Sequence, residues 1–288
     1  MMEKKPYTTG HVTSADGTRI GYRQMGTGPG VILVHGGIQA AQNFMELGAA
    51  LATDFTVYIP DRRGRGLSGD FGEHYNLFKD AEDMQAIVQK TGAKNIFGLS
   101  SGAIITLQTA LMEPSLTKVA LYEPPLPLPG VDHSRMNKRY DKAIAKGNLG
   151  KGMVSIIKGT GDPSLFSALP SFITAPLVNL GIKKRGKRNK EGDVPLKDLI
   201  PTFHYDRIIV SGATDLIEKS KTIKARIFLL GGTKSKKFLK LALNELNKAL
   251  PGAERVEFKG LGHLAASNGG NPAAVAKELR GFFKKQSF

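Results

Sequence analysis

Apolar residues along the chain gather in short continuous runs, separated by segments in which they recur at helical spacing. Continuous runs of this length predict strands that are buried on both faces, as in a parallel sheet. Five segments carry this pattern: Gly30–Gly37, Phe55–Asp61, Lys94–Ser100, Thr117–Pro125 and Ala225–Gly232. Two more, Thr18–Gly26 and Ala253–Gly260, alternate apolar and polar positions like half-buried strands.

Helical patterns lie between these predicted strands. The clearest covers Leu77–Thr91, where Phe78, Ala81, Met84 and Ile87 recur at intervals of three or four. Similar segments are Phe44–Ala52, Ala103–Met112, Phe238–Leu250 and Ala273–Phe283. Strands that alternate with helices predict an α/β fold, with a mostly parallel central sheet and helices on both of its faces.

The alternation stops after Pro125 and resumes only near Thr222. The nearly one hundred residues between these points contain short helical pieces but no strand pattern. We therefore expect a core formed by residues 1–125 and 223–288, and a helical cap formed by residues 126–222.

Charge adds a question about partners, because the formal net charge is +16. Residues 131–200 hold 14 Lys and Arg against 6 Asp and Glu, and the densest run is Lys183–Lys190, "KKRGKRNK". No aromatic residues are interleaved with this run, so we interpret it as a solvated surface loop. Nucleic acid is therefore not the expected partner.

Composition also narrows the class of protein. The chain has no cysteine, which excludes disulfides and thiolate metal sites. We find no apolar stretch of signal-peptide or membrane-span length. The expectation is a cytoplasmic enzyme that needs no metal and no cofactor; the sequence leaves its oligomeric state open.

The candidate chemistry begins at Gly98-Leu99-Ser100-Ser101-Gly102, between a predicted buried strand and a predicted helix. A strand, Gly-x-Ser-x-Gly and a helix together form a nucleophile elbow, which exposes the serine hydroxyl on a sharp turn. The register makes Ser100 the nucleophile and the Ser101 backbone N–H an oxyanion donor. A serine at this place could instead only cap the helix.

A serine nucleophile also needs a second oxyanion donor and a general base. The glycines of His35-Gly36-Gly37 follow an earlier strand, and Gly37 is the expected donor, with Ile38 as the alternative. We interpret His35 as a structural residue that anchors this loop. His263 lies on a loop after the last predicted strand and is the expected general base.

These motifs, together with Pro60–Gly69 ("PDRRGRGLSG") and Gly260–His263 ("GLGH"), resemble the α/β-hydrolase superfamily. The resemblance implies a triad with an acid. In most members the acid follows the strand placed here at Ala225–Leu230, but Gly231–Lys237 contains no carboxylate. Some haloalkane dehalogenases and zearalenone lactonases carry the acid one strand earlier, where this chain has Glu123. Glu123 is therefore the expected acid, with Asp206 and Asp215 as weaker candidates.

The resemblance implies a serine hydrolase that cleaves a small apolar carboxylic ester or lactone through an acyl-enzyme. Dehalogenase chemistry is not expected, because those enzymes carry Asp where this chain has Ser100. A ligand-binding, receptor-like member and a C–C bond hydrolase or acyltransferase remain alternatives. Substrate contacts are expected from Ile38, Phe166, Phe172 and His204, with Phe166 and Phe172 in an apolar ceiling that also includes Leu169, Ile173, Leu177 and Leu180.

Overall fold

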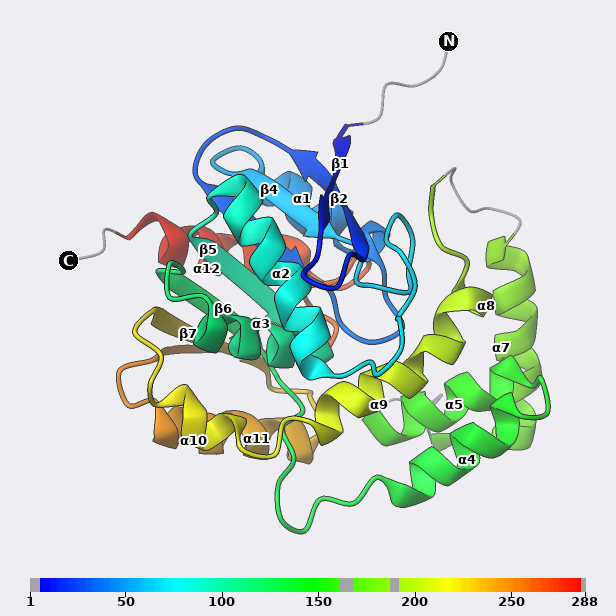
Figure 1. Ribbon diagram of the computed structural model, residues 1–288. Helices are drawn as coiled ribbons and strands as arrows, with labels where there is room; N and C mark the ends of the chain where they lie inside the picture. Colours follow the sequence, from blue (N-terminus) through cyan, green and yellow to red (C-terminus); the bar gives the residue numbers. More distant parts are fainter. Residues whose placement is uncertain (1–5, 161–167, 187–191, 286–288) are drawn as a thin grey trace.

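The protein, seen here as a computed structural model, forms a twisted eight-stranded sheet flanked by helices (Figure 1). The structure describes residues 6–160, 168–186 and 192–285. The strand order is β1-β2-β4-β3-β5-β6-β7-β8, in which β2 is antiparallel to both of its neighbours and β3 to β8 run parallel. The predicted fold class is confirmed. The strands span Thr8–Thr13, Arg19–Met25, Gly30–Val34, Thr56–Pro60, Asn95–Leu99, Lys118–Tyr122, Arg226–Gly232 and Glu254–Phe258 in chain order.

The continuous apolar runs arise because the inner strands contact a separate core on each face. In β3, Ile32 and Val34 join one core, whereas Val31 and Leu33 join the other. The first core contains α2 (Leu77–Thr91), α3 (Ser101–Met112) and α11 (Lys237–Ala249); the second contains α1 (Met45–Leu51) and α12 (Pro272–Lys284). Side chains alternate across a strand, so burial on both faces requires apolar residues at every position.

The first strand was not predicted from the sequence. β1 reads TTGHVT, and within it only Val12 is buried. It pairs antiparallel with β2 at the edge of the sheet, where one side of the strand has no neighbour. An exposed edge strand does not need an alternating apolar pattern, and so its sequence resembles that of a loop.

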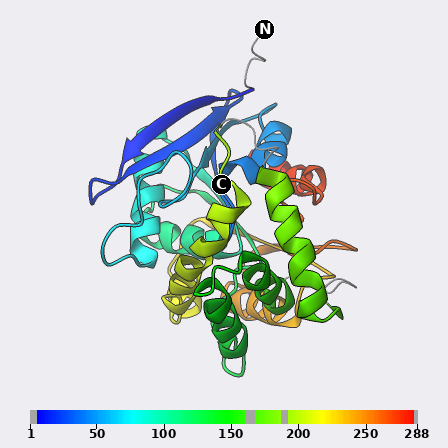
Figure 2. The ribbon, with the colours of Figure 1, turned by 90° about the vertical axis from the view of Figure 1, so that its right-hand side faces the viewer.

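Between β6 and β7, the described residues contain only helices and connecting turns. These helices, which we call the insertion, are α4 (Ser134–Ile144), α5 (Leu149–Thr160), α7 (Ser171–Gly186), α8 (Leu196–Leu199), η2 (Ile200–Thr202), α9 (Phe203–Ser211) and α10 (Leu216–Ser220). Figure 1 shows α4, α5, α7 and α8 to the right of the sheet, and Figure 2 brings them to the front. Together with η2 they form a small core of Tyr140, Ile156, Ile182 and Ile200.

The last part of the insertion is attached to the sheet domain. Both α9 and α10 contact α3, the helix that begins at the nucleophile elbow. The division at residues 125 and 222 therefore stays a prediction. None of the described helices is both long and apolar enough to cross a lipid bilayer.

Candidate active site

Ser100 occupies the sharp turn between β5 and α3. Its backbone has φ 58° and ψ −126°, a conformation that L-residues rarely adopt. The Ser100 amide donates to the Tyr122 carbonyl of the next strand at 2.9 Å, and the Ser100 carbonyl accepts from the Ala103 amide at 2.9 Å. The turn is thus held from both sides, and strain of this kind gathers at functional sites.

The glycines of the elbow are required by close packing. A Cβ on Gly98 would lie 2.4 Å from the Gly102 carbonyl oxygen. A Cβ on Gly102 would lie 2.4 Å from the carbonyl oxygens of Val34 and His35. Because no side chain fits at either position, the strand-to-helix turn can approach β3 and its following loop.

Glu123 and His263, 140 residues apart in the sequence, form a direct pair. The Glu123 carboxylate Oε2 lies 2.8 Å from Nδ1 of His263, and its Oε1 accepts from the Gly232 amide at 2.7 Å. Glu123 is fully buried and His263 is 7% exposed. Glu123 also has a positive φ, 44°, which directs the chain sharply out of β6. A carboxylate held in this way orients an imidazole for proton transfer.

The glycines after β7 leave space for this carboxylate. A Cβ on Gly231 would lie 3.0 Å from Oε1 of Glu123 and 2.9 Å from the Leu243 side chain. The loop after β7 has no carboxylate of its own, and the carboxylate of Glu123, which follows the neighbouring strand β6, packs against its glycines.

The two weaker acid candidates have other partners. Asp206 accepts hydrogen bonds from Arg62 at 2.8 Å and Arg65 at 2.9 Å, and it is 3% exposed. The Asp215 carboxylate is 54% exposed and lies 2.6 Å from Nζ of Lys219, one turn along α10. The structure therefore favours Glu123 over both.

Two backbone amides near Ser100 are suited to binding an oxyanion. Neither the Gly37 nor the Ser101 amide donates to an acceptor within the described part of the chain. The alternative donor, the Ile38 amide, donates to Oδ2 of Asp206 at 3.3 Å. This contact leaves Gly37 and Ser101 as the candidate pair.

His35 joins the Gly36–Gly37 turn to the loop after β4. Its Nδ1 lies 3.0 Å from the Gly36 carbonyl, and its Nε2 accepts from the Arg62 amide at 3.2 Å. Complete burial, followed by the charges of Arg65 and Arg62, lowers the pKa of His35 well below its usual value. The ring is neutral, with its proton on Nδ1, so His35 has the structural role that we expected.

A buried charge network surrounds this loop, and the sequence analysis did not find it. Arg62 contacts Asp80 at 3.2 Å and Asp206 at 2.8 Å, and all three side chains are at most 4% exposed. Arg65 is fully buried and donates to the Gly36 and Gln39 carbonyls as well as to Asp206. One signal was present in the sequence: Asp80 lies on the inward face of α2, next to Ala81 and Met84 in the apolar pattern.

The four predicted substrate contacts have different environments. Ile38 packs against the core of the insertion. His204 is exposed, with Nδ1 3.2 Å from Nη2 of Arg207, and Phe172 is 74% exposed. Phe166 lies outside the described residues. Of the three contacts that the structure describes, Ile38 is linked to the elbow, because its amide and the Ser101 hydroxyl both donate to Asp206.

The expected apolar ceiling is not found among the described residues. Five of its proposed members are 42–74% exposed: Leu169, Phe172, Ile173, Leu177 and Leu180. The side of α7 that faces the protein carries Thr174, Ala175 and Ile182 instead. Because α7 is apolar on both sides, its sequence does not reveal which side is buried.

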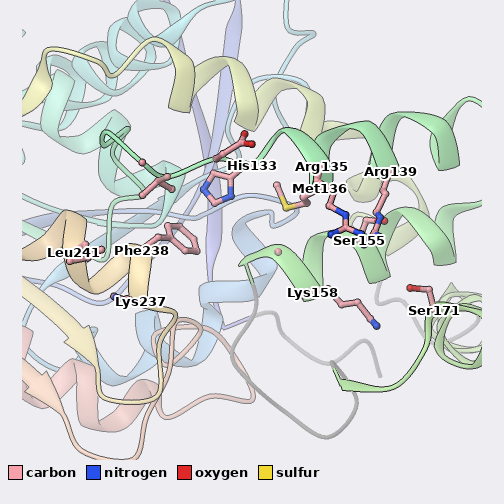
Figure 3. Close-up of a pocket in the computed structure, with 14 residues that line it drawn as sticks. His133, Arg135, Met136, Arg139, Ser155, Lys158, Ser171, Lys237, Phe238 and Leu241 are labelled. Carbon is pink, nitrogen blue, oxygen red and sulfur yellow. The ribbon is translucent and has the colours of Figure 1, made fainter.

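A cavity of about 540 Å³ lies between the insertion and α11 (Figure 3). Its lining includes Arg135 and Arg139 of α4 and the ring of Phe238, which lies edge-on to His133. None of the candidate catalytic residues lines this cavity, so it is separate from the triad. Among the described residues, no three His, Asp or Glu side chains converge as ligands for a metal ion.

The family follows from comparison with known proteins. The model of the Alpha/beta hydrolase family matches residues 31–278, which is most of the chain. The protein therefore belongs to this family.

Individual relatives match a shorter part of the chain than the family model does. The chain is 34% identical over 114 residues to "Uncharacterized hydrolase YraK" of Bacillus subtilis, a match covering 38% of this chain and 42% of the relative. It is 30% identical over 103 residues to pyrrolizixenacetamide deacetylase of Xenorhabdus hominickii, covering 35% and 39%. The matched segment thus spans about two fifths of each relative's length.

Solved structures resemble almost the whole chain. An alpha/beta hydrolase from Sphaerobacter thermophilus has a TM-score of 0.76 and 27% identity, with 96% of this chain and 100% of that chain covered. The enol-lactonase from Burkholderia xenovorans has a TM-score of 0.69 and 18% identity, with the same coverage. At 18% identity the second likeness shows the fold alone.

Proposed function

We propose that the protein is a serine hydrolase that cleaves an apolar carboxylic ester or lactone, with Ser100, His263 and Glu123 as its triad. The observation that carries this proposal is the 2.8 Å contact between Glu123 Oε2 and His263 Nδ1. It supplies the orienting acid that the loop after β7 lacks. Ser100 lies on the elbow beside β6, the strand that leads into Glu123.

In the proposed mechanism each group has one step. A carboxylate facing Nδ1 keeps the imidazole proton there, so that Nε2 is unprotonated and can accept the Ser100 proton. Ser100 Oγ then bonds to the carbonyl carbon, and the amides of Gly37 and Ser101 stabilise the oxyanion. The leaving alcohol takes the proton from His263, and an acyl-enzyme remains. Water activated by His263 releases the acid in the same way.

One observation supports an apolar substrate: Ile38, next to the proposed oxyanion donor, packs against the apolar core of the insertion. The insertion also contacts the elbow helix α3 through α9. We therefore propose that the insertion acts as the cap over the site.

One relative suggests amides as a rival substrate class. The name of the Xenorhabdus relative refers to removal of an acetyl group from an amide. A triad of this type can cleave amides as well as esters, and the leaving group decides between them. Anilides therefore belong in the test beside esters and lactones.

The test is hydrolysis of p-nitrophenyl esters of increasing acyl length, a lactone series and p-nitroanilides. We expect turnover of esters or lactones by the wild type and loss of at least about a thousandfold in Ser100→Ala. Ser155→Ala is the matched control, because its hydroxyl donates only to a carbonyl within α5. Turnover that survives Ser100→Ala would contradict the proposal. A wild type that cleaves nothing but binds apolar carbonyl compounds would favour a receptor-like protein.

A further inference from the structure

A single carboxylate from the insertion contacts both walls of the proposed oxyanion hole. Asp206 lies on α9, and its Oδ1 accepts from the Ser101 hydroxyl at 3.0 Å. Its Oδ2 accepts from the Ile38 amide at 3.3 Å. Ser101 carries one proposed oxyanion donor, and Ile38 shares a peptide bond with Gly37, which carries the other.

The Ile38 backbone needs such a partner. Its φ is 57°, and a β-branched residue in this region is strained. Strained residues persist only where the surroundings hold them. The hydrogen bond to Asp206 is a direct restraint on this peptide. Without it, the Gly37–Ile38 peptide could rotate, and rotation about the Gly37 backbone dihedrals could then turn the preceding Gly36–Gly37 peptide, whose N–H is the proposed donor, away from Ser100.

Two arginines allow a carboxylate to remain so close to a developing negative charge. Burial raises the pKa of Asp206, but the charges of Arg65 and Arg62 outweigh burial and bring it to about 2. Arg65 also donates to the Gly36 and Gln39 carbonyls, on either side of the strained turn. The carboxylate and the two guanidinium groups thus form one rigid support beneath the Gly36–Gln39 turn.

We propose that Asp206 is a positioning residue that couples docking of the insertion to assembly of the oxyanion hole. The inference rests on the proposed function, since it assigns Gly37 and Ser101 as oxyanion donors. Asp206 itself does not touch the substrate. Asp206 acts by positioning the two amides, whose hydrogen bonds to the oxyanion form fully only in the transition state.

The test compares Asp206→Asn with Asp215→Asn. Asparagine keeps the shape but replaces one acceptor oxygen by a donor, whereas Asp215 is an exposed carboxylate in the same insertion. We expect Asp206→Asn to lower kcat about ten- to a hundredfold while KM stays within about threefold, less than the loss of a whole oxyanion donor. Asp215→Asn should match the wild type in both constants.

A second readout does not depend on hydrolysis. Amide hydrogen exchange should become faster in the segment 36–39 of Asp206→Asn and stay unchanged in β8. A merely structural role would lower the melting temperature but leave kcat per folded molecule unchanged. If folded Asp206→Asn has a kcat within twofold of wild type and normal exchange at 36–39, the proposal is wrong.

If Asp206→Asn does not fold, Ser101→Ala decides the question. This change keeps the Ser101 amide and both Arg–Asp206 pairs, and it removes the hydroxyl's bond to Asp206 together with the bond that the hydroxyl accepts from Arg62 at 3.2 Å. We expect kcat to fall about threefold or more with KM unchanged, and a kcat equal to wild type would contradict the proposal. If the wild type itself lacks hydrolysis and Ser100 labelling, the proposed function fails. The exchange experiment on Asp206→Asn still tests the positioning role in that case: unchanged exchange at 36–39 would contradict it.

Discussion

Replacing Glu123 by Gln changes one atom of the triad acid and keeps its size. Glu123 Oε1 accepts from the Gly232 amide at 2.7 Å, so the glutamine oxygen would take that place. The glutamine NH₂ would then face Nδ1 of His263, where the carboxylate Oε2 now lies at 2.8 Å. An NH₂ group cannot accept a proton, so it favours the imidazole tautomer with its proton on Nε2.

That tautomer cannot accept the Ser100 proton. The comparable change in a serine-protease triad lowers kcat by about 10⁴, which is about 5.4 kcal/mol of activation free energy. We expect Glu123→Gln to lose at least about a hundredfold in kcat, or roughly 2.7 kcal/mol. KM should change little, because Glu123 is fully buried and does not reach the substrate.

The assay is steady-state hydrolysis of the best p-nitrophenyl ester, with circular dichroism to verify folding. Asp215→Asn serves as the control for loss of a carboxylate, since its side chain is 54% exposed. A folded Glu123→Gln enzyme with kcat within threefold of wild type would refute the assignment of Glu123 as the acid. Loss of turnover in the Asp215→Asn control would place the acid in the insertion instead.

Three further predictions concern the nucleophile, the basic run and the effect of acid. A fluorophosphonate probe should label wild type and Ser101→Ala but not Ser100→Ala, and the reverse pattern would move the nucleophile to Ser101. Replacing the Lys and Arg residues of Lys183–Lys190 by Gln should leave kcat on a neutral ester within a few-fold, because Lys183 and Lys184 are exposed and the charges of exposed side chains are screened by salt. Residues 187–190 of the run lie outside the described residues. A hundredfold loss would show that the run positions the substrate. The pKa of Asp206 is about 2 in the folded state against an ordinary value of 3.8. The stabilisation that ionised Asp206 adds to the free energy of unfolding is therefore complete above about pH 4 and is lost as the pH falls through about 2. The shift corresponds to about 2 kcal/mol, and urea unfolding between pH 6 and pH 3 should therefore show a weaker acid dependence in Asp206→Asn than in wild type.

The parts of the fold that could be predicted are those with a local signal. The helix expected at Leu77–Thr91 has those bounds in the structure, because Asn76 caps its first turn and Gly92 ends it with φ 68°. The inner strands were found because burial on both faces requires continuous apolar runs. The elbow was found because Gly98 and Gly102 stand where no side chain fits.

The parts that could not be predicted depend on contacts between distant segments. Asp206 meets Arg62 across 144 residues, and nothing near Asp206 in the sequence indicates that its carboxylate is buried. The outward face of α7 was likewise mistaken for an inward one, because Phe172 and Ala175 suit either environment until the neighbouring helices are in place. The pairing of Glu123 with His263 was expected by elimination, from a carboxylate missing elsewhere.

The proposed mechanism depends most on Ser100 forming a covalent acyl-enzyme. Mass spectrometry of the wild type, quenched in acid during turnover of a p-nitrophenyl ester and then digested, measures this directly. We predict an added acyl group on the peptide that contains Ser100, located on Ser100 by fragmentation and absent in Ser100→Ala. An acyl group located on Ser101 or on any other residue would contradict the account, as would turnover that continues undiminished in Ser100→Ala.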